Sequence, residues 1–167
     1  MNRIRQFIWA LNAKFKPIDE AYLKKYLSKE EFDLFNKLNV SEKHHCIRVC
    51  KDSIDYINNS SNIQDIISIT KMAKVALLHD IGKINKSLNV LDKCMLVILD
   101  KITRGRLKKI NNTKVDIYYN HGKKSYDLLK SIGCYDDEVL QAVEMHHSKR
   151  TYKNIYLQIL KEMDDKN

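Results

Sequence analysis

Residues 72–83, MAKVALLHDIGK, join a strongly apolar run to an imidazole and a carboxylate that stand side by side. The run predicts a buried helix, which would carry His79 and Asp80 into the protein interior. Burying either group costs free energy unless a charge or a hydrogen-bond partner meets it. A metal ion is one such partner. A plain turn that ends the helix near Gly82 is the alternative reading of this stretch.

The composition favours an all-α protein. The chain has 167 residues, of which 44% are hydrophobic and 31% charged, with only 4 Gly and 1 Pro. Few turn-forming residues and many Leu, Ile, Lys and Glu predict helices rather than many strands. The net charge of +9 suits an anionic substrate or surface. The basic residues are scattered along the whole chain, however, which disfavours nucleic acid as a partner.

The expected helices follow from the spacing of apolar residues and from capping signals. Their ranges are 3–15, 19–27, 29–38, 42–58, 63–79, 88–103, 114–132, 136–147 and 152–164. Ser28 and Glu31 have the spacing of a capping box, and Ser41 is placed to cap the range 42–58. We expect residues 1–40 to form a helical extension packed on a domain of residues 41–167.

The histidines gather at the ends and first turns of four expected helices. They are His44, His45, His79, His121, His146 and His147. Asp80 and Asp164 are carboxylates placed to join them. Helix bundles build metal sites from inward-facing side chains of different helices, and imidazole with carboxylate suits iron, manganese or zinc. Each histidine alone can also be an ordinary capped or solvated residue, and His146-His147 can be a favourable pair at a helix C-terminus.

The order His45, then His79-Asp80 in an intact HDIGK, then a late Asp164 resembles the HD-domain superfamily of metal-dependent phosphohydrolases. The resemblance covers about residues 41–165. Residues 45–49, HCIRV, are similar to that family's first-histidine segment. Residues 142–147, AVEMHH, are similar to the double-histidine segment of its cyclic-dinucleotide phosphodiesterase branches. The Gly-Tyr-Pro loop of one such branch is missing here, so the resemblance does not extend to cyclic di-GMP specificity.

The resemblance implies an all-α HD-domain bundle with two divalent ions, expected to be iron or manganese rather than zinc or magnesium. Asp80 would bridge the ions. The remaining implied ligands are His45, His79 and Asp164 for one ion and His121, His146 and His147 for the other. A metal-activated hydroxide would attack a nucleotide or cyclic nucleotide phosphoester. Asp80 and Lys83 are the implied catalytic residues, and Lys83 and Arg150 the candidates to bind the substrate phosphate.

Two other functions stay open at this point, a diiron oxygenase of the same fold and a non-catalytic signalling module. The 4 cysteines lack zinc-ribbon spacing and indicate buried thiols in a reducing cytosol. No cysteine falls at a position that matches the histidines, which argues against a structural zinc site. The longest apolar run, residues 94–99, is too short to span a bilayer, and the N-terminus is a poor signal peptide. We therefore predict a cytoplasmic protein without a transmembrane segment.

Overall fold

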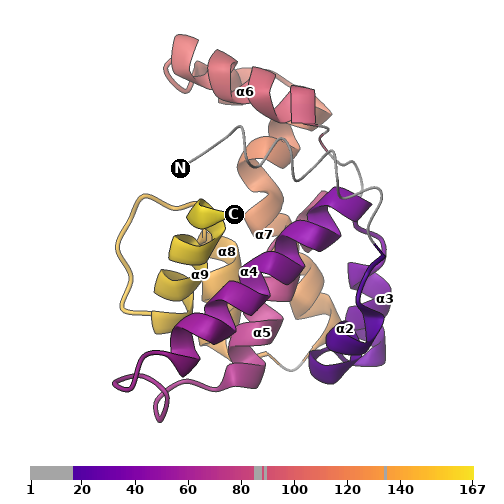
Figure 1. Ribbon diagram of the computed structural model, residues 1–167. Helices are drawn as coiled ribbons and strands as arrows, with labels where there is room; N and C mark the ends of the chain where they lie inside the picture. The colour runs from indigo at the N-terminus through magenta and orange to yellow at the C-terminus, as the bar shows by residue number, and fades with distance from the viewer. Residues whose placement is uncertain (1–16, 85–87, 89, 134) are drawn as a thin grey trace.

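The computed structural model describes residues 17–84, 88, 90–133 and 135–167, and this part of the chain is helical without a β-strand (Figure 1). The α-helices are α2 (Glu20–Tyr26), α3 (Lys29–Phe35), α4 (Val40–Asn58), α5 (Ile69–Leu78), α6 (Val90–Ile102), α7 (Thr113–Ile132), α8 (Asp137–Met145) and α9 (Ile155–Lys166), joined by the short 3₁₀ helices η2 (Ile81–Lys83) and η3 (Arg106–Lys109). The all-α prediction is confirmed. The helix expected at 3–15 lies outside the described residues.

The ends of the helices follow the capping chemistry, with two corrections. The capping box at Ser28 and Glu31 is present. The prediction that Ser41 caps the helix expected at 42–58 was wrong: α4 begins earlier, where the side chain of Asn39 accepts a hydrogen bond from the backbone N of Glu42 at 2.9 Å. α5 is also shorter than expected. It begins at a Ser68 cap, because residues 61–66 form turns rather than a helical continuation.

The main core surrounds α5. Six of the last seven residues of this helix, 72–78, are apolar side chains with 0% exposure. α4, α8 and α9 pack around it, and α2 and α3 add Leu23 and Phe35 to the same hydrophobic cluster. A helix that is apolar over most of its surface is stable only inside a protein, which explains why α5 is central. The division of the chain at residue 40 stays a prediction.

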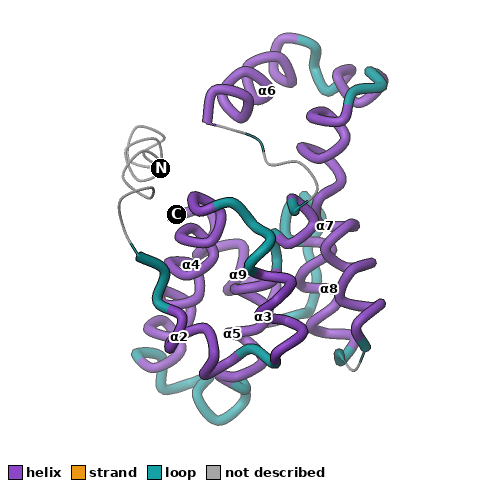
Figure 2. The backbone as a smooth tube through the Cα atoms, turned by 90° about the vertical axis from the view of Figure 1, so that its right-hand side faces the viewer, coloured by secondary structure: helices purple, strands orange, loops and turns teal. Residues whose placement is uncertain are grey.

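A smaller hydrophobic cluster lies at the outer end of α7. It joins Leu96 of α6, Leu107 of η3 and Val115 and Ile117 of α7. Figure 2 shows α6 held away from the other helices by α7, whose 20 residues reach from the main bundle to this cluster. The described part of the chain thus forms one main bundle and one projecting helix.

Candidate metal centre

The end of α5 places His79 and Asp80 at the centre of the bundle. His79 is the C-cap of α5 and has 0% of its surface exposed. Asp80 leaves the helical conformation, precedes η2 and is 1% exposed. The apolar run of α5 therefore carries both polar side chains into the interior, where each needs a polar partner.

Gly82 allows η2 to approach α7 closely. A Cβ on Gly82 would lie only 2.1 Å from the backbone O of His121 and 2.8 Å from the backbone N of Ser125. The Ser125 hydroxyl ties the two segments together, since it accepts a hydrogen bond from Gly82 N at 2.8 Å and donates one to His79 O at 2.7 Å. Gly82 has no positive φ. α5 does end in a turn here, and Gly82 also allows a close backbone approach.

Gly122 allows a similar approach between α7 and α8. A Cβ there would lie 2.7 Å from the backbone O of Glu144. The close packing sets the ring of His121 5.2 Å from that of His146 and 4.7 Å from that of His147, measured between centroids. These histidines lie on one side of Asp80. The Nε2 atoms of His121 and His146 are 3.4 and 3.8 Å from Asp80 Oδ1.

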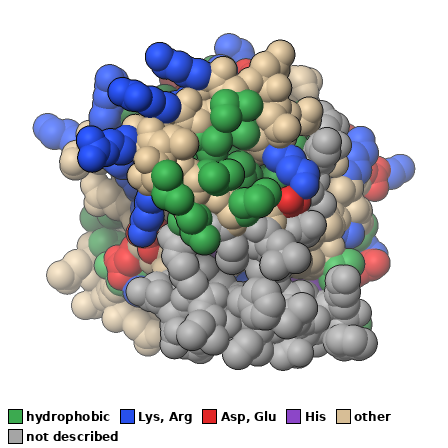
Figure 3. All heavy atoms as spheres, turned by 90° about the horizontal axis from the view of Figure 1, so that it is seen from above, with side chains coloured by type: hydrophobic (Ala, Val, Ile, Leu, Met, Phe, Trp, Pro, Cys, Tyr) green, Lys and Arg blue, Asp and Glu red, His purple; other side chains and the backbone are tan. Residues whose placement is uncertain are grey.

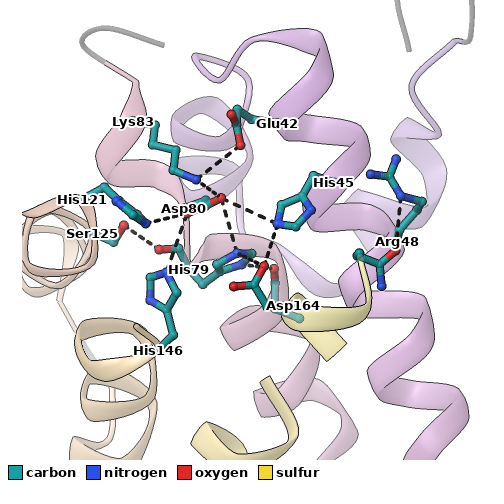
Figure 4. Close-up of polar contacts among 12 residues, drawn as sticks. Glu42, His45, Arg48, His79, Asp80, Lys83, His121, Ser125, His146 and Asp164 are labelled. Atoms are coloured by element: carbon teal, nitrogen blue, oxygen red, sulfur yellow. Dashed lines mark hydrogen bonds and ion pairs between the residues drawn. The ribbon is translucent and has the colours of Figure 1, made fainter. Parts of the chain in front are cut away.

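The other oxygen of Asp80 faces a second group of side chains, which come from α4, α5 and α9 (Figure 4). His45 Nε2 lies 2.9 Å from Asp164 Oδ1 and 3.8 Å from Asp80 Oδ2. His79 Nε2 lies 3.4 Å from Asp80 Oδ2 and 3.8 Å from Asp164 Oδ1. The two carboxylate oxygens of Asp80 therefore point to two different groups of imidazoles.

The spacing of these atoms fits metal ions. Within each group the potential ligand atoms lie within 4.8 Å of one another; the groups are Asp80, His121, His146 and His147, and His45, His79 and Asp164. Two ligand atoms about 2.1 Å from a shared ion, at angles of roughly 90–110°, would be about 3.0–3.4 Å apart. The separations of 2.9–3.8 Å are close to that range.

Four buried side-chain atoms in the described part of the chain lack a hydrogen-bond partner, and all belong to these groups. They are His79 Nε2, Asp80 Oδ1, His121 Nε2 and His146 Nε2. An unpaired buried polar atom costs about 1–3 kcal/mol, so four in one place call for a bound partner. The Nδ1 atoms of the same histidines lie 2.6–2.8 Å from backbone carbonyls of the preceding helical turns. Donation to those carbonyls leaves each Nε2 lone pair turned into the site, as metal ligation requires.

The electrostatics of the site favour cation binding. Burial, with the nearby charge of Lys83, lowers the pKa of His121 to about 3. Burial and then His147 hold the pKa of His146 well below its usual value. Burial by itself would raise the pKa of Asp80, but Lys83 and the surrounding imidazoles outweigh it and leave that pKa well below the usual range. At neutral pH His121 and His146 are therefore neutral and Asp80 is ionised, which are the protonation states that bind metal.

Lys83 lies against Asp80 and has a partner that the sequence did not reveal. Its Nζ is 2.5 Å from Asp80 Oδ2 and 3.5 Å from Glu42 Oε2, and Glu42 is 1% exposed. Burial would lower the pKa of Lys83, but the two carboxylates raise it overall, so the ammonium stays charged. Glu42, an acid in the first turn of α4, is a site residue that the sequence did not single out. The signal available was its position three residues before His45, on the same face of the helix.

Three further side chains differ from the buried histidines in their exposure or in their protonation. His147 belongs to the ligand group but is exposed, so it marks the open side of the site. Arg150 is exposed, and within the described residues its side chain makes no ion pair and no hydrogen bond; only its backbone N bonds Ser148 Oγ. The expectation that no cysteine matches the histidines was wrong in geometry, because Cys46 Sγ lies within 4.8 Å of ligand atoms of His79 and Asp80. Burial raises the pKa of this thiol well above its usual value, however, and keeps it protonated.

A comparison with protein-family models matches residues 43–166 to the HD domain. The chain belongs to the HD-domain family. No curated protein and no solved structure matched it. HD domains are all-α, bind divalent metal ions and make up a superfamily of metal-dependent phosphohydrolases, which agrees with the His and Asp cluster of this chain. Of the helices in the described part of this HD-domain protein, none has the length and apolarity that crossing a bilayer requires.

Proposed function

We propose that this HD-domain protein is a phosphohydrolase that uses two divalent ions to cleave a nucleotide or cyclic nucleotide phosphoester. One observation carries the proposal: two groups of imidazoles face the two different oxygens of the buried Asp80 carboxylate. A carboxylate in that position suits a bridge between two ions. Pairs of ions roughly 3.5–4 Å apart are common in enzymes that transfer or hydrolyse phosphoryl groups.

The proposed ligands follow the two groups. Asp80 would serve both ions, with His45, His79 and Asp164 on one side and His121, His146 and His147 on the other. Iron or manganese suits this set of imidazoles and carboxylates better than magnesium, which prefers oxygen ligands alone. Ions held there supply a water activated as a nucleophile near neutral pH and positive charge for the phosphate oxygens.

Lys83 has two proposed roles in the chain's own share of the chemistry. Its contacts with Asp80 and Glu42 use two of its three N–H donors and fix the position of the Asp80 carboxylate. The third donor and the full positive charge are then available to a phosphate oxygen of the substrate. Preorganised positive charge of this kind stabilises the negative charge that develops in phosphoryl transfer. Arg150, an exposed residue of the segment between α8 and α9, stays a proposed phosphate contact.

The open side of the site supports an anionic small molecule as substrate. The side chains of His45 and Asp164 are 18% and 14% exposed and His147 is exposed, whereas His79 and Asp80 are closed to solvent. A substrate would therefore enter past His147. The net charge of +9 raises the local concentration of anions around the molecule.

The proposal is tested first by metal content per chain, measured by mass spectrometry on anaerobically purified protein, and then by phosphate release from a panel of nucleotides and cyclic nucleotides. We compare Asp80→Asn with Asp127→Asn, since Asp127 is an exposed aspartate on α7. We expect about two ions per chain in the wild type and in Asp127→Asn, fewer in Asp80→Asn, and hydrolysis only where the ions are retained.

Each other outcome has a definite meaning. One ion per chain would restrict the site to a single group of ligands. Oxygen uptake without phosphate release would assign the diiron oxygenase. Absence of metal in all samples after reconstitution would refute the catalytic function and leave a signalling module.

A further inference from the structure

α6 carries an apolar surface that faces solvent. Met95, Ile98, Leu99 and Ile102, which we call the α6 ridge, are 53%, 57%, 36% and 71% exposed. Their spacing of three and four residues places them on one face of the helix. Soluble proteins rarely leave contiguous apolar side chains exposed, and larger patches mark surfaces that bind something.

The α6 ridge is not needed to complete the protein's own core. A neighbouring face of α6 already packs, since Leu96 is 4% exposed and belongs to the cluster with Leu107 and Ile117. Figures 1 and 2 agree that α6 lies apart from the main bundle, at the outer end of α7. The ridge is therefore a projecting surface rather than a groove that could receive another helix.

Positive charge surrounds one end of the ridge. The exposed cationic side chains are Lys101, Arg104, Arg106, Lys108 and Lys109. Among the described residues none of them makes an ion pair, and Lys108 stacks its ammonium 4.9 Å from the centre of the Tyr119 ring. Figure 3 looks down on this face, with hydrophobic side chains together in the middle and Lys and Arg side chains beside them.

The two acids of α6 do not offset this charge, because both are paired toward α7. Asp92 lies 2.5 Å from Lys114 Nζ, and Asp100 accepts a hydrogen bond from the Tyr119 hydroxyl. The face that carries the ridge is thus apolar at its centre and cationic at its edge. It has no acidic side chain to attract the cations of another copy of the same face.

We propose that the α6 ridge docks the protein on an anionic lipid bilayer. Apolar side chains of a surface helix insert at the boundary between headgroups and acyl chains, while Lys and Arg contact lipid phosphates. Each such cation near an anionic membrane contributes about 1 kcal/mol, or roughly fivefold in affinity. A second copy is a poorer occupant, since pairing two ridges brings two cationic edges together. This proposal is independent of the catalytic one.

The first test measures co-sedimentation with vesicles of phosphatidylcholine alone or of an equimolar mixture with phosphatidylglycerol. We compare Ile102→Glu with Ile66→Glu, because Ile102 and Ile66 are 71% and 72% exposed and Ile66 lies in the segment between α4 and α5, at the far end of the molecule (Figure 1). Circular dichroism checks that both variants are folded. We expect the wild type and Ile66→Glu to bind the anionic vesicles and Ile102→Glu to bind at least about tenfold more weakly.

The second test removes charge rather than apolar surface. The double variant Arg104→Gln/Arg106→Gln is expected to bind the anionic vesicles about 25-fold more weakly, and added salt should weaken wild-type binding. Wild-type protein that stays in the supernatant with both kinds of vesicle would refute the proposal. So would equal binding by Ile102→Glu and Ile66→Glu, or a lipid-free dimer in light scattering that Ile102→Glu dissociates, which would assign the ridge to a second copy.

Discussion

The substitution Gly82→Ala should separate the two halves of the site. The new Cβ would lie 2.1 Å from His121 O, 2.8 Å from Ser125 N and 2.9 Å from Lys124 Cβ. A carbon and a carbonyl oxygen approach comfortably to about 3.3 Å, so α7 must move away from η2 by about 1 Å. Backbone rather than a flexible side chain blocks the space, so rotamer changes cannot absorb the overlap.

The displacement acts on one group of ligands only. α7 carries His121 and packs against α8, which leads to His146 and His147, whereas His45 and Asp164 come from α4 and α9. Overpacking of this kind costs about 1–3 kcal/mol of stability. We expect Gly82→Ala to stay folded, to lose the ion held by the histidines of α7 and α8, and to keep the other. Titration with Co²⁺, followed by absorption and by calorimetry, counts the ions and measures each affinity.

Gly133→Ala provides the matched control. Gly133 has φ +90°, a conformation that costs other residues about 1–3 kcal/mol, but a Cβ there would meet nothing within 4 Å. The two variants should therefore lose similar stability, while Gly133→Ala binds metal like the wild type. If Gly82→Ala binds the same number of ions with wild-type affinity, then the close approach at Gly82 does not position the second half of the site and the reasoning is refuted.

Three further predictions concern polar side chains in and beside the site. Glu42→Gln removes one carboxylate from the buried Lys83 ammonium, so thermal unfolding should show a loss of about 1.5–3 kcal/mol, and the KM for an anionic substrate should change as Lys83 shifts. Burial lowers the pKa of His121 to about 3, so between about pH 6.5 and pH 3 the metal-free unfolded state binds more protons than the folded state. The free energy of unfolding, measured by calorimetry, should therefore decrease as the pH is lowered through this range, by about 1.4 kcal/mol per pH unit for this group. His121→Gln should make that decrease smaller. Asn167→Ala removes the hydrogen bonds of a buried amide to Asp52 Oδ2 at 2.7 Å and Met163 O at 3.0 Å, so the end of α9 should loosen and metal affinity on the Asp164 side should fall, as measured by competition with a chelator.

The sequence predicted what depends on local chemistry. Ser28 with Glu31 marked a helix start because a capping box is made by neighbours in the chain. The apolar run before His79 predicted a buried helix end for a similar reason. The residues proposed as ligands could be named because imidazole and carboxylate groups at these positions resemble those of a known family, and the structure brings all seven together.

What could not be predicted depends on contacts between distant segments. Glu42 is a buried partner of Lys83 only because the fold brings the start of α4 against η2; its spacing from His45 indicates a shared helix face but not that Glu42 is buried. The role of Gly82 is set by α7, about 40 residues further along the chain. The choice of Asn39 over Ser41 as the cap of α4 was a local question, but both residue types are good caps, so the sequence offered two comparable answers.

The stretch HDIGK is held in place by hydrogen bonds that leave its metal-facing atoms free. Three contacts fix the stretch HDIGK: His79 Nδ1 lies against the carbonyl of Ala76, Gly82 N donates to Ser125 Oγ, and Lys83 Nζ donates to Asp80 Oδ2 within the stretch itself. None of these contacts uses the Nε2 of His79 or the Oδ1 of Asp80, and both atoms are left without a partner in the described part of the chain. Preorganisation of this kind lowers the cost of binding, because the ligands lose little further freedom when an ion arrives. A site built only for structural stability would have paired these atoms within the protein, so their free lone pairs support the proposal that this site binds metal ions.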